Sequence, residues 1–306
     1  MTIRSITVAD AIRIAALRGP DWVINPWGAA SGGRRLFSPA RFLSEYLRPR
    51  PRGAAWVTGN GLKGTALASA KPRAGPTAWI MDHLVTPRYD VGPCCELLEE
   101  VAIHAGHRGA ERLFLQLLDD DQLVDMARSS GFVPCAQVLL FTLSGQGTLL
   151  DMTSVAGLRK REPSDDLSLF RLYSATTPAD VRSGIGATLV QWKDAQEPLR
   201  RSTQELVLEE RDGIKGWLRL DLHRKWATAR LSIQPGWEGD IIALVALAQK
   251  ESESRILCWE VPESDGTLRL VLERAGFEAT GSYWLFIKLL AVRVKELLLA
   301  TAPTSG

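Results

Sequence analysis

Apolar and polar residues follow two different periods along this chain. Short apolar runs, several of them alternating with polar residues, predict strands at 80–86, 112–118, 136–143, 255–261 and 282–289. A three-and-four spacing of apolar residues instead predicts a helix over 93–105, with one face buried. Strands mixed with helices in this order indicate an α+β fold with a mixed sheet.

The same landmarks occur twice in the same order. The matching pairs are GLKGTALA (61–68) with GIKGWLRL (213–220), Arg4 and Asp10 with Arg159 and Asp165, Val85-Thr86-Pro87 with Ile233-Gln234-Pro235, and Gly131-Phe132 with Gly276-Phe277. Chance rarely supplies four such matches in one order. The sequence therefore predicts two tandem copies of one domain, 1–147 and 153–306, joined by the glycine-bearing segment 145–157.

Each copy contains one residue expected to start a helix and one expected to end a helix. After its first short strand comes an aspartate, Asp10 or Asp165, which we expect to cap the helix that follows. Near its end comes a glycine, Gly131 or Gly276, placed where a helix C-terminus requires a left-handed residue. A last strand then closes each copy.

Composition indicates a water-soluble globular protein. The chain has 306 residues, with 45% apolar and 24% charged residues and a net charge of +2. No apolar stretch free of charge is long enough to span a bilayer, and the first residues do not form a secretory signal. The four cysteines have neither zinc-site nor disulfide-framework spacing. We expect a cytoplasmic protein without a structural metal.

The strand that ends in Val85-Thr86-Pro87, the glycine-bearing turn, the next helix and the final Gly-Phe strand resemble the GNAT superfamily of acyl-CoA-dependent N-acyltransferases. The resemblance extends over both copies, so the chain is similar to a tandem GNAT protein. It implies two GNAT-like domains, acetyl-CoA or another acyl-CoA as cosubstrate and a small-molecule amine as acceptor. Whether the strands around 80–86 and 112–118 separate to leave a slot for pantetheine would distinguish such an acyltransferase from a non-catalytic GNAT-fold protein.

The turn after Val85-Thr86-Pro87 resembles the family's pyrophosphate-binding loop, in which backbone N–H groups and a helix N-terminus point at the anion. By resemblance, the cofactor-binding residues are Leu84, Val85, Arg88, Tyr89, Asp90, Val91, Gly92, Pro93 and Cys94. The family's opening arginine or glutamine is missing, and Asp90 adds a negative charge beside the anion. Pro93 lacks an N–H but suits the first turn of a helix. A plain connection without a ligand is the alternative interpretation.

The matching turn of the second copy departs further from the family. It holds Gly236 and Gly239, but also the acids Glu238 and Asp240 and no arginine, and it is too short for the motif. We therefore expect CoA binding in the first copy and a degenerate second copy.

Acyl transfer to an amine requires a base, a donor for the oxyanion and a proton for the thiolate. In the family, a backbone N–H on the strand before Val-x-Pro holds the oxyanion, and the base lies on this or a neighbouring strand. Asp82 and His83 are the resulting catalytic candidates. Strand alternation predicts that they point to opposite faces, so that one of them faces the cleft. Histidine titrates near neutral pH, which suits a base, although a single strand histidine is commonly an ordinary hydrogen-bonded residue.

Two further positions add no catalytic group. The family's usual proton donor is a tyrosine four residues before Gly-Phe, where this chain has Ala127 and Leu272. Cys94 and Cys95 lie at a helix N-terminus, but no histidine is adjacent in sequence, and small buried thiols are common in protein cores.

Residues 34–52 contain six arginines and one acid, interleaved with aromatic residues. In the family this region covers the acceptor side of the cleft, and its arginines would favour an acidic acceptor, the CoA phosphates or nucleic acid; the alternative is a solvated helix face. The small net charge argues against a nucleic-acid partner. The tail VRVKELLLA leaves homo-oligomerisation open.

These inferences predict an acyl-CoA-dependent N-acyltransferase that acts on an amine, with its active site in the first copy. The alternative is a catalytically inactive GNAT-fold protein that binds a small molecule or acts as a scaffold.

Overall fold

A computed structural model describes residues 3–17, 21–23, 37–48, 51–58, 66–86, 92–143, 155–237, 239 and 241–291. The predicted domain boundaries, at residues 147 and 153, lie outside these ranges. The N-terminal half is taken below as the described residues before 144, and the C-terminal half as those after 154.

Strands and helices occur close to where the sequence predicts them. The strands are β1 (Ile3–Ser5), β2 (Ala54–Thr58), β3 (Ala66–Pro72), β4 (Ala78–Val85), β5 (Arg112–Leu118), β6 (Val133–Leu143), β7 (Leu158–Lys160), β8 (Thr203–Glu210), β9 (Gly213–Leu222), β10 (Trp226–Ile233), β11 (Ile256–Pro262) and β12 (Phe277–Leu289). The helices are α1 (Ala11–Ala16), α3 (Pro39–Tyr46), α4 (Gly92–His107), α5 (Asp121–Ser129), α6 (Asp166–Thr176), α7 (Ala179–Ile185), α8 (Leu189–Asp194), α9 (Ile241–Ser252) and α10 (Gly266–Arg274), with 3-10 turns η1 (Val8–Asp10) and η2 (Pro163–Asp165). Among the described residues, no helix combines the length and apolar character that a membrane crossing requires.

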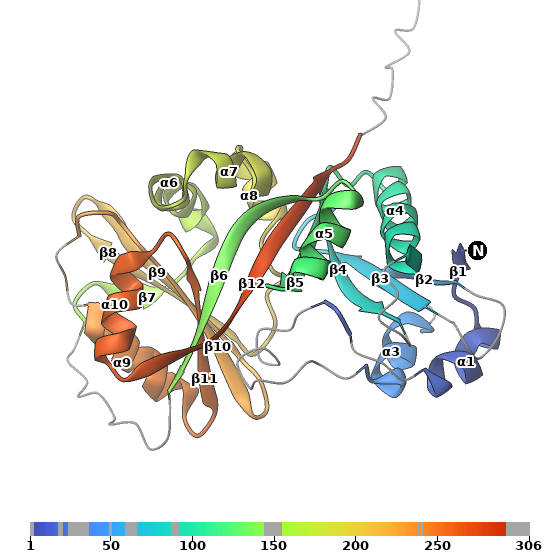
Figure 1. Cartoon of the computed structure of the whole chain (residues 1–306). Helices are drawn as coiled ribbons and strands as arrows, with labels where there is room; N and C mark the ends of the chain where they lie inside the picture. The colour runs from blue at the N-terminus through green and yellow to red at the C-terminus, as the bar shows by residue number, and fades with distance from the viewer. Residues whose placement is uncertain are drawn as a thin grey trace, which may run out of the picture.

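In the described part of the chain, twelve strands form one mixed sheet in the order β1-β2-β3-β4-β5-β12-β6-β11-β10-β9-β8-β7. Helices cover both faces of it because each face is apolar. In the N-terminal half, α4 and α5 pack on one face and α1 and α3 on the other. In the C-terminal half, α9 and α10 pack on one face and α6 and α8 on the other. Figure 1 shows the two halves side by side, with β6 and β12 between them.

The two halves exchange their last strands. β6 follows α5 of the N-terminal half, yet it pairs with β11, while β12 pairs with β5. The two exchanged strands also pair with each other in antiparallel orientation, at the centre of the sheet (Figure 1). Phe286 of β12 is buried in the core beneath α4, and Phe141 of β6 is buried in the core beneath α9. Neither half therefore completes its sheet or its core alone.

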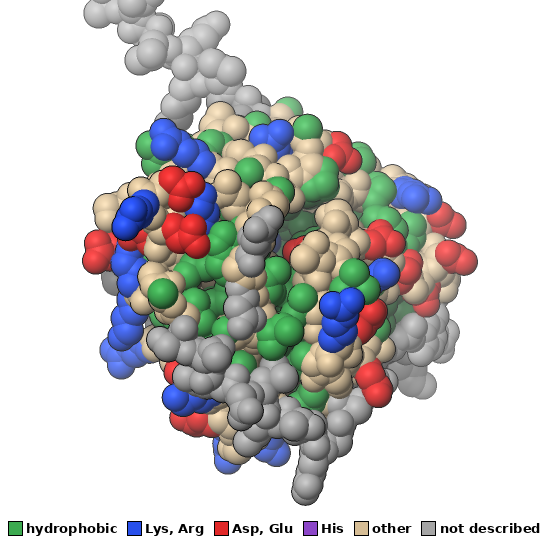
Figure 2. Space-filling model, turned by 90° about the vertical axis from the view of Figure 1, so that its left-hand side faces the viewer, with side chains coloured by type: hydrophobic (Ala, Val, Ile, Leu, Met, Phe, Trp, Pro, Cys, Tyr) green, Lys and Arg blue, Asp and Glu red, His purple; other side chains and the backbone are tan. Residues whose placement is uncertain are grey.

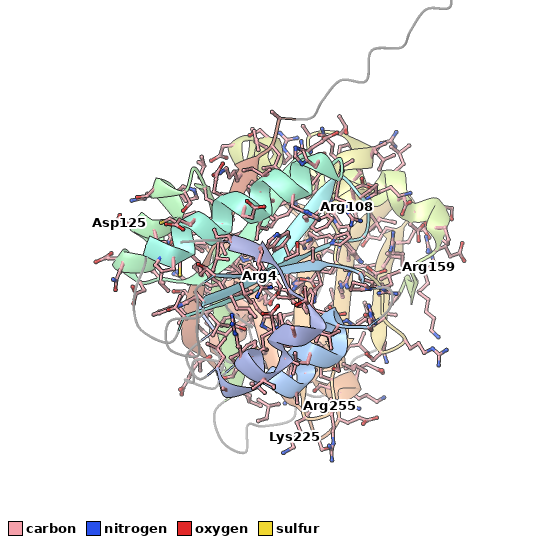
Figure 3. The ribbon with its side chains drawn as sticks, turned by 90° about the vertical axis from the view of Figure 1, so that its right-hand side faces the viewer. Arg4, Arg108, Asp125, Arg159, Lys225 and Arg255 are labelled. Atoms are coloured by element: carbon pink, nitrogen blue, oxygen red, sulfur yellow. The ribbon has the colours of Figure 1, made fainter. Side chains whose placement is uncertain are left out.

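The repeated Arg–Asp pair forms the same structure in both halves. Arg4 donates two hydrogen bonds to Asp10, of 2.7 and 2.5 Å, and Arg159 donates two to Asp165, of 2.8 and 2.7 Å. Each carboxylate also accepts the backbone N–H three residues earlier, at 2.8 Å. Figure 3 labels both arginines. Asp10 and Asp165 occupy the N-cap positions of α1 and α6, as predicted, but their side chains accept no hydrogen bond from those helices; their oxygens close the preceding 3-10 turn instead.

Glycines allow a positive φ at two helix ends and a close contact between the two halves. Gly131 and Gly276 have φ of +77° and +85°, as predicted for the residue after a helix C-terminus. Gly75 lies in the β3–β4 loop, which contacts the C-terminal half, and a Cβ atom on it would meet the Asp194 carboxylate at 1.8 Å. Thr77 donates a hydrogen bond of 2.6 Å to the same carboxylate, so this loop fixes one half against the other.

Candidate functional site

β4 and β5 form a fork in the N-terminal half. They pair in parallel at only three positions, Ala78–Ile80 with Arg112–Phe114. Beyond these positions β4 continues along β3, and β5 continues along β12. The two strands therefore separate beyond Ile80 and Phe114.

A β-bulge at Asp82 reorients the strand beside the fork. The register with β3 shifts between Ala70, which opposes Met81, and Ser69, which opposes His83, so Asp82 is the extra residue. Asp82 and His83 consequently point to the same face, the one covered by α3. The prediction of opposite faces was wrong, because regular alternation does not hold across a bulge.

Asp82 is an ionised carboxylate held by two donors. Tyr46 donates its hydroxyl hydrogen bond to Asp82 at 2.8 Å, and the ammonium of Lys71 lies 2.6 Å from it. Burial raises the pKa of Asp82, but the charges of Lys71 and His83 and the two hydrogen bonds outweigh this effect and lower it to about 2. Burial, reinforced by Asp82, raises the pKa of Tyr46 well above its usual value. A carboxylate this acidic is a poor proton acceptor at neutral pH, but it can orient and stabilise a cation.

His83 lies between two carboxylates beneath an aromatic cover. Its Nδ1 is 2.5 Å from Oδ2 of Asp21, and its Nε2 is 3.6 Å from Oδ2 of Asp82. The rings of Phe37 and Phe42 meet the imidazole edge-on, with centroids 5.7 and 5.5 Å away. Only 3% of the His83 side chain is exposed, so the ring is enclosed in this arrangement.

Residues 21–23 of the chain itself fill the fork. Asp21 bridges to Val85 of β4, and Val23 bridges to Leu117 of β5, both in antiparallel orientation. The backbone N–H of Trp22 donates to the carbonyl oxygen of Leu84 at 2.8 Å. The Leu84 N–H in turn donates to the Asp21 carboxylate at 3.1 Å. The strands separate as a pantetheine slot requires, but a peptide segment occupies the gap.

The structure covers only part of the predicted cofactor loop. Arg88, Tyr89, Asp90 and Val91 lie outside the described residues, whereas Gly92, Pro93 and Cys94 form the first turn of α4. Leu84 and Val85 lie in β4 at the fork, where their backbones contact residues 21–23.

Two sets of residues that the sequence singled out contribute to packing around the site. Cys94 is buried in the core beneath α4, and Ala127 and Leu272, at the usual position of the family's tyrosine, are fully buried. In the basic segment, Arg41 and Arg48 are exposed. Its aromatic residues instead pack inward around His83, which gives this segment a structural role at the site.

No described residue range enters the equivalent fork in the C-terminal half. β10 and β11 pair in parallel from Trp226–Ala229 with Ile256–Trp259 and then separate. Beyond the paired positions lies a cavity of about 260 Å³, lined by residues from the ends of both strands, from the turn at 234–237 and from the start of α10. Figure 2 shows the side of the molecule formed by this half, where hydrophobic side chains gather between charged ones. A larger hollow of about 1040 Å³, between α4 and the end of β12, touches neither fork.

The opposite side of the C-terminal fork is filled by ion pairs. Arg230 of β10 contacts Glu260 of β11 and donates to Glu197 at 2.7 Å. Arg73 of the N-terminal half lies 3.9 Å from Glu197. Burial raises the pKa of Glu260, although Arg230 opposes the shift. These charges neutralise one another where the N-terminal half has Asp82 and His83.

Solved structures resemble the whole chain. A GCN5-related N-acetyltransferase from Sphaerobacter thermophilus superimposes with a TM-score of 0.56 at 16% identity, covering 94% of this chain and 95% of that one. A Pyrococcus horikoshii protein with a provisional acetyltransferase assignment gives 0.54 at 12% identity, covering 96% and 91%. The chain has the GNAT fold. The predicted α+β class with two GNAT-like units is thereby confirmed. No family model and no curated protein matches the sequence.

Sequence reasoning missed three members of the site. Asp21, Tyr46 and Lys71 surround Asp82 and His83, but they come from separate parts of the chain. Tyr46 is in the basic segment and so offered a weak signal, whereas Lys71 of β3 lies outside every predicted strand. Asp21 offered none, because its partner is 62 positions away.

Proposed function

We propose that this protein is an acyl-CoA-dependent N-acyltransferase that acts on a small amine, with its acyl-transfer site at the fork of the N-terminal half. One observation carries the proposal: in a GNAT fold, the bulge at Asp82 directs both Asp82 and His83 to the α3-covered face beside a fork between parallel strands. The C-terminal fork has a neutralised Arg230–Glu260 pair instead of a base.

Each group near the fork suits a different part of acyl transfer. His83 would take the proton of the attacking amine and return it to the CoA thiolate as the C–S bond breaks, and Asp82, ionised at neutral pH, would stabilise the imidazolium in between. The N–H of Leu84 would donate to the oxyanion, since it points into the gap between the strands. The N-terminus of α4, starting at Gly92, would receive the pyrophosphate of acetyl-CoA or another acyl-CoA.

A second candidate is a GNAT-fold protein that binds a small molecule without catalysis. The C-terminal cavity favours it, since that fork borders a cavity in the described part of the chain while residues 21–23 fill the N-terminal fork. Two variants separate the candidates. Gly92→Glu places a negative charge at the start of α4, and Ser232→Trp fills the C-terminal cavity, which Ser232 lines.

The experiment is calorimetric titration of acetyl-CoA and free CoA into the protein and both variants, followed by an acceptor screen that detects released thiol. Loss of binding in Gly92→Glu but not in Ser232→Trp supports the proposed site. Loss of CoA binding in Ser232→Trp but not in Gly92→Glu would assign the CoA site to the C-terminal half. No binding at millimolar CoA in any form rejects the acyltransferase and leaves the second candidate. If thiol release occurs, His83→Gln should lower its rate by about a hundredfold or more.

A further inference from the structure

Segment 21–23 has the contacts of a strand inserted into the N-terminal fork. It pairs with β4 on one side, at Val85, and with β5 on the other, at Leu117. It thus continues the sheet at the point where β4 and β5 no longer reach each other. Trp22 and Val23 are 7% and 4% exposed and pack into the core beneath α4.

The contacts of this segment satisfy the polar groups that an acyl thioester would need at the fork. The carbonyl oxygen of Leu84 accepts from Trp22 N–H, and the N–H of Leu84 donates to the Asp21 carboxylate. The second oxygen of the same carboxylate contacts His83. An anionic oxygen therefore lies on the proposed oxyanion donor while its partner oxygen engages the proposed base.

A carboxylate is an unusual choice for a permanent strand at this position. The side chain of Asp21 is fully buried, and burying a charge is costly unless a partner compensates it. A buried ion pair also tends to stabilise a fold less than apolar residues of similar size would. Trp22 and Val23 pack into the apolar core at the gap. The carboxylate of Asp21 instead contacts the two proposed reactive groups, the His83 imidazole and the Leu84 N–H.

We propose that residues 21–23 form an internal occluding strand, which competes with the acyl-CoA arm for the N-terminal fork and must leave before acyl transfer. The inference rests on the proposed function. Departure of the segment frees the N–H and carbonyl of Leu84 and releases His83 from Asp21 at the same time. The occupied fork is thus an autoinhibited state in which slot and base are blocked together.

By linkage, the apparent dissociation constant for CoA equals the intrinsic one divided by the open fraction. Asp21→Ala removes the contacts to His83 and Leu84, so we expect it to bind CoA at least tenfold more tightly than the unaltered protein. Asp10→Ala is the matched control, because it removes an equally buried, ion-paired carboxylate of the same half that is not at the fork. It should leave CoA affinity within about twofold.

A reversible lock tests the competition directly. Val23 and Leu117 are antiparallel partners, whose Cα separation suits a disulfide, so Val23→Cys with Leu117→Cys can be oxidised to hold the segment in place. The oxidised double variant should bind CoA at least a hundredfold more weakly, and reduction should restore binding. Val23→Cys alone should not respond to oxidation. Equal CoA binding by the oxidised and reduced forms overturns the inference while leaving acyl-CoA binding itself intact.

Hydrogen exchange decides the inference even if no form binds CoA. If the segment leaves the fork, the amides of Trp22 and Leu84 exchange at least a hundredfold faster than those of the paired strand positions Trp79 and Leu113. If all four amides exchange at the same slow rate, the segment is a permanent strand and the inference is wrong. Failure to bind CoA, by contrast, counts against the proposed function alone.

Discussion

Phe286→Ala is expected to loosen the N-terminal half, although residue 286 lies near the end of the chain. Phe286 is fully buried in β12, in the core formed by β2 to β5 and α4. Replacing a buried phenylalanine by alanine costs about 3–5 kcal/mol, because apolar burial is lost and a cavity remains. If β5 and α4 open together, their protected amides should exchange faster by about a hundredfold or more, since each ~1.4 kcal/mol corresponds to a factor of ten.

Hydrogen exchange with mass spectrometry localises this effect, and Phe141→Ala supplies a reciprocal control. Phe141 is also fully buried, but it lies in the core of the C-terminal half. Its replacement should accelerate exchange in peptides from β10, β11 and α9. Phe286→Leu, a smaller loss of volume costing less than about 1.5 kcal/mol, provides a folded fallback. If Phe286→Ala affected only peptides after residue 154, the strand exchange would be refuted.

Three other predictions test the site and the fold. Because the pKa of Asp82 is lowered in the folded state, its stabilisation, of about 2 kcal/mol, is complete above about pH 4 and disappears as the pH falls towards about 2. Urea unfolding at pH 7 and pH 3 should therefore show a weaker loss of stability in Asp82→Asn, and an unchanged pH dependence would contradict this. Gly131→Ala should cost about 1–2 kcal/mol by thermal unfolding because of its positive φ, whereas Gly266→Ala, in open space, should be nearly neutral. Burial and a nearby carboxylate raise the pKa of Cys135 to about 12, so iodoacetamide at pH 8 should alkylate it more slowly than Cys95, and equal rates would contradict its burial.

The sequence by itself determined the local elements and their repetition. Apolar periodicity located β5 and α4 closely, because these patterns depend on neighbouring residues. The repeated Arg–Asp pairs and the glycines at 131 and 276 also identify equivalent positions, since each motif is closed within a few residues. From such landmarks the two GNAT-like units could be predicted.

Only the tertiary structure decided how these elements combine at the site. One extra residue at Asp82 reverses the faces of the strand after it, and periodicity cannot reveal a bulge that depends on pairing with β3. The sequences of β6 and β12 do not reveal which half each strand joins, because either half offers the strand an equivalent apolar place in its sheet. The insertion of Asp21 beside His83 depends on a contact across 62 positions. Long-range pairing of this kind is set by the packing of the whole chain, not by any local pattern in it.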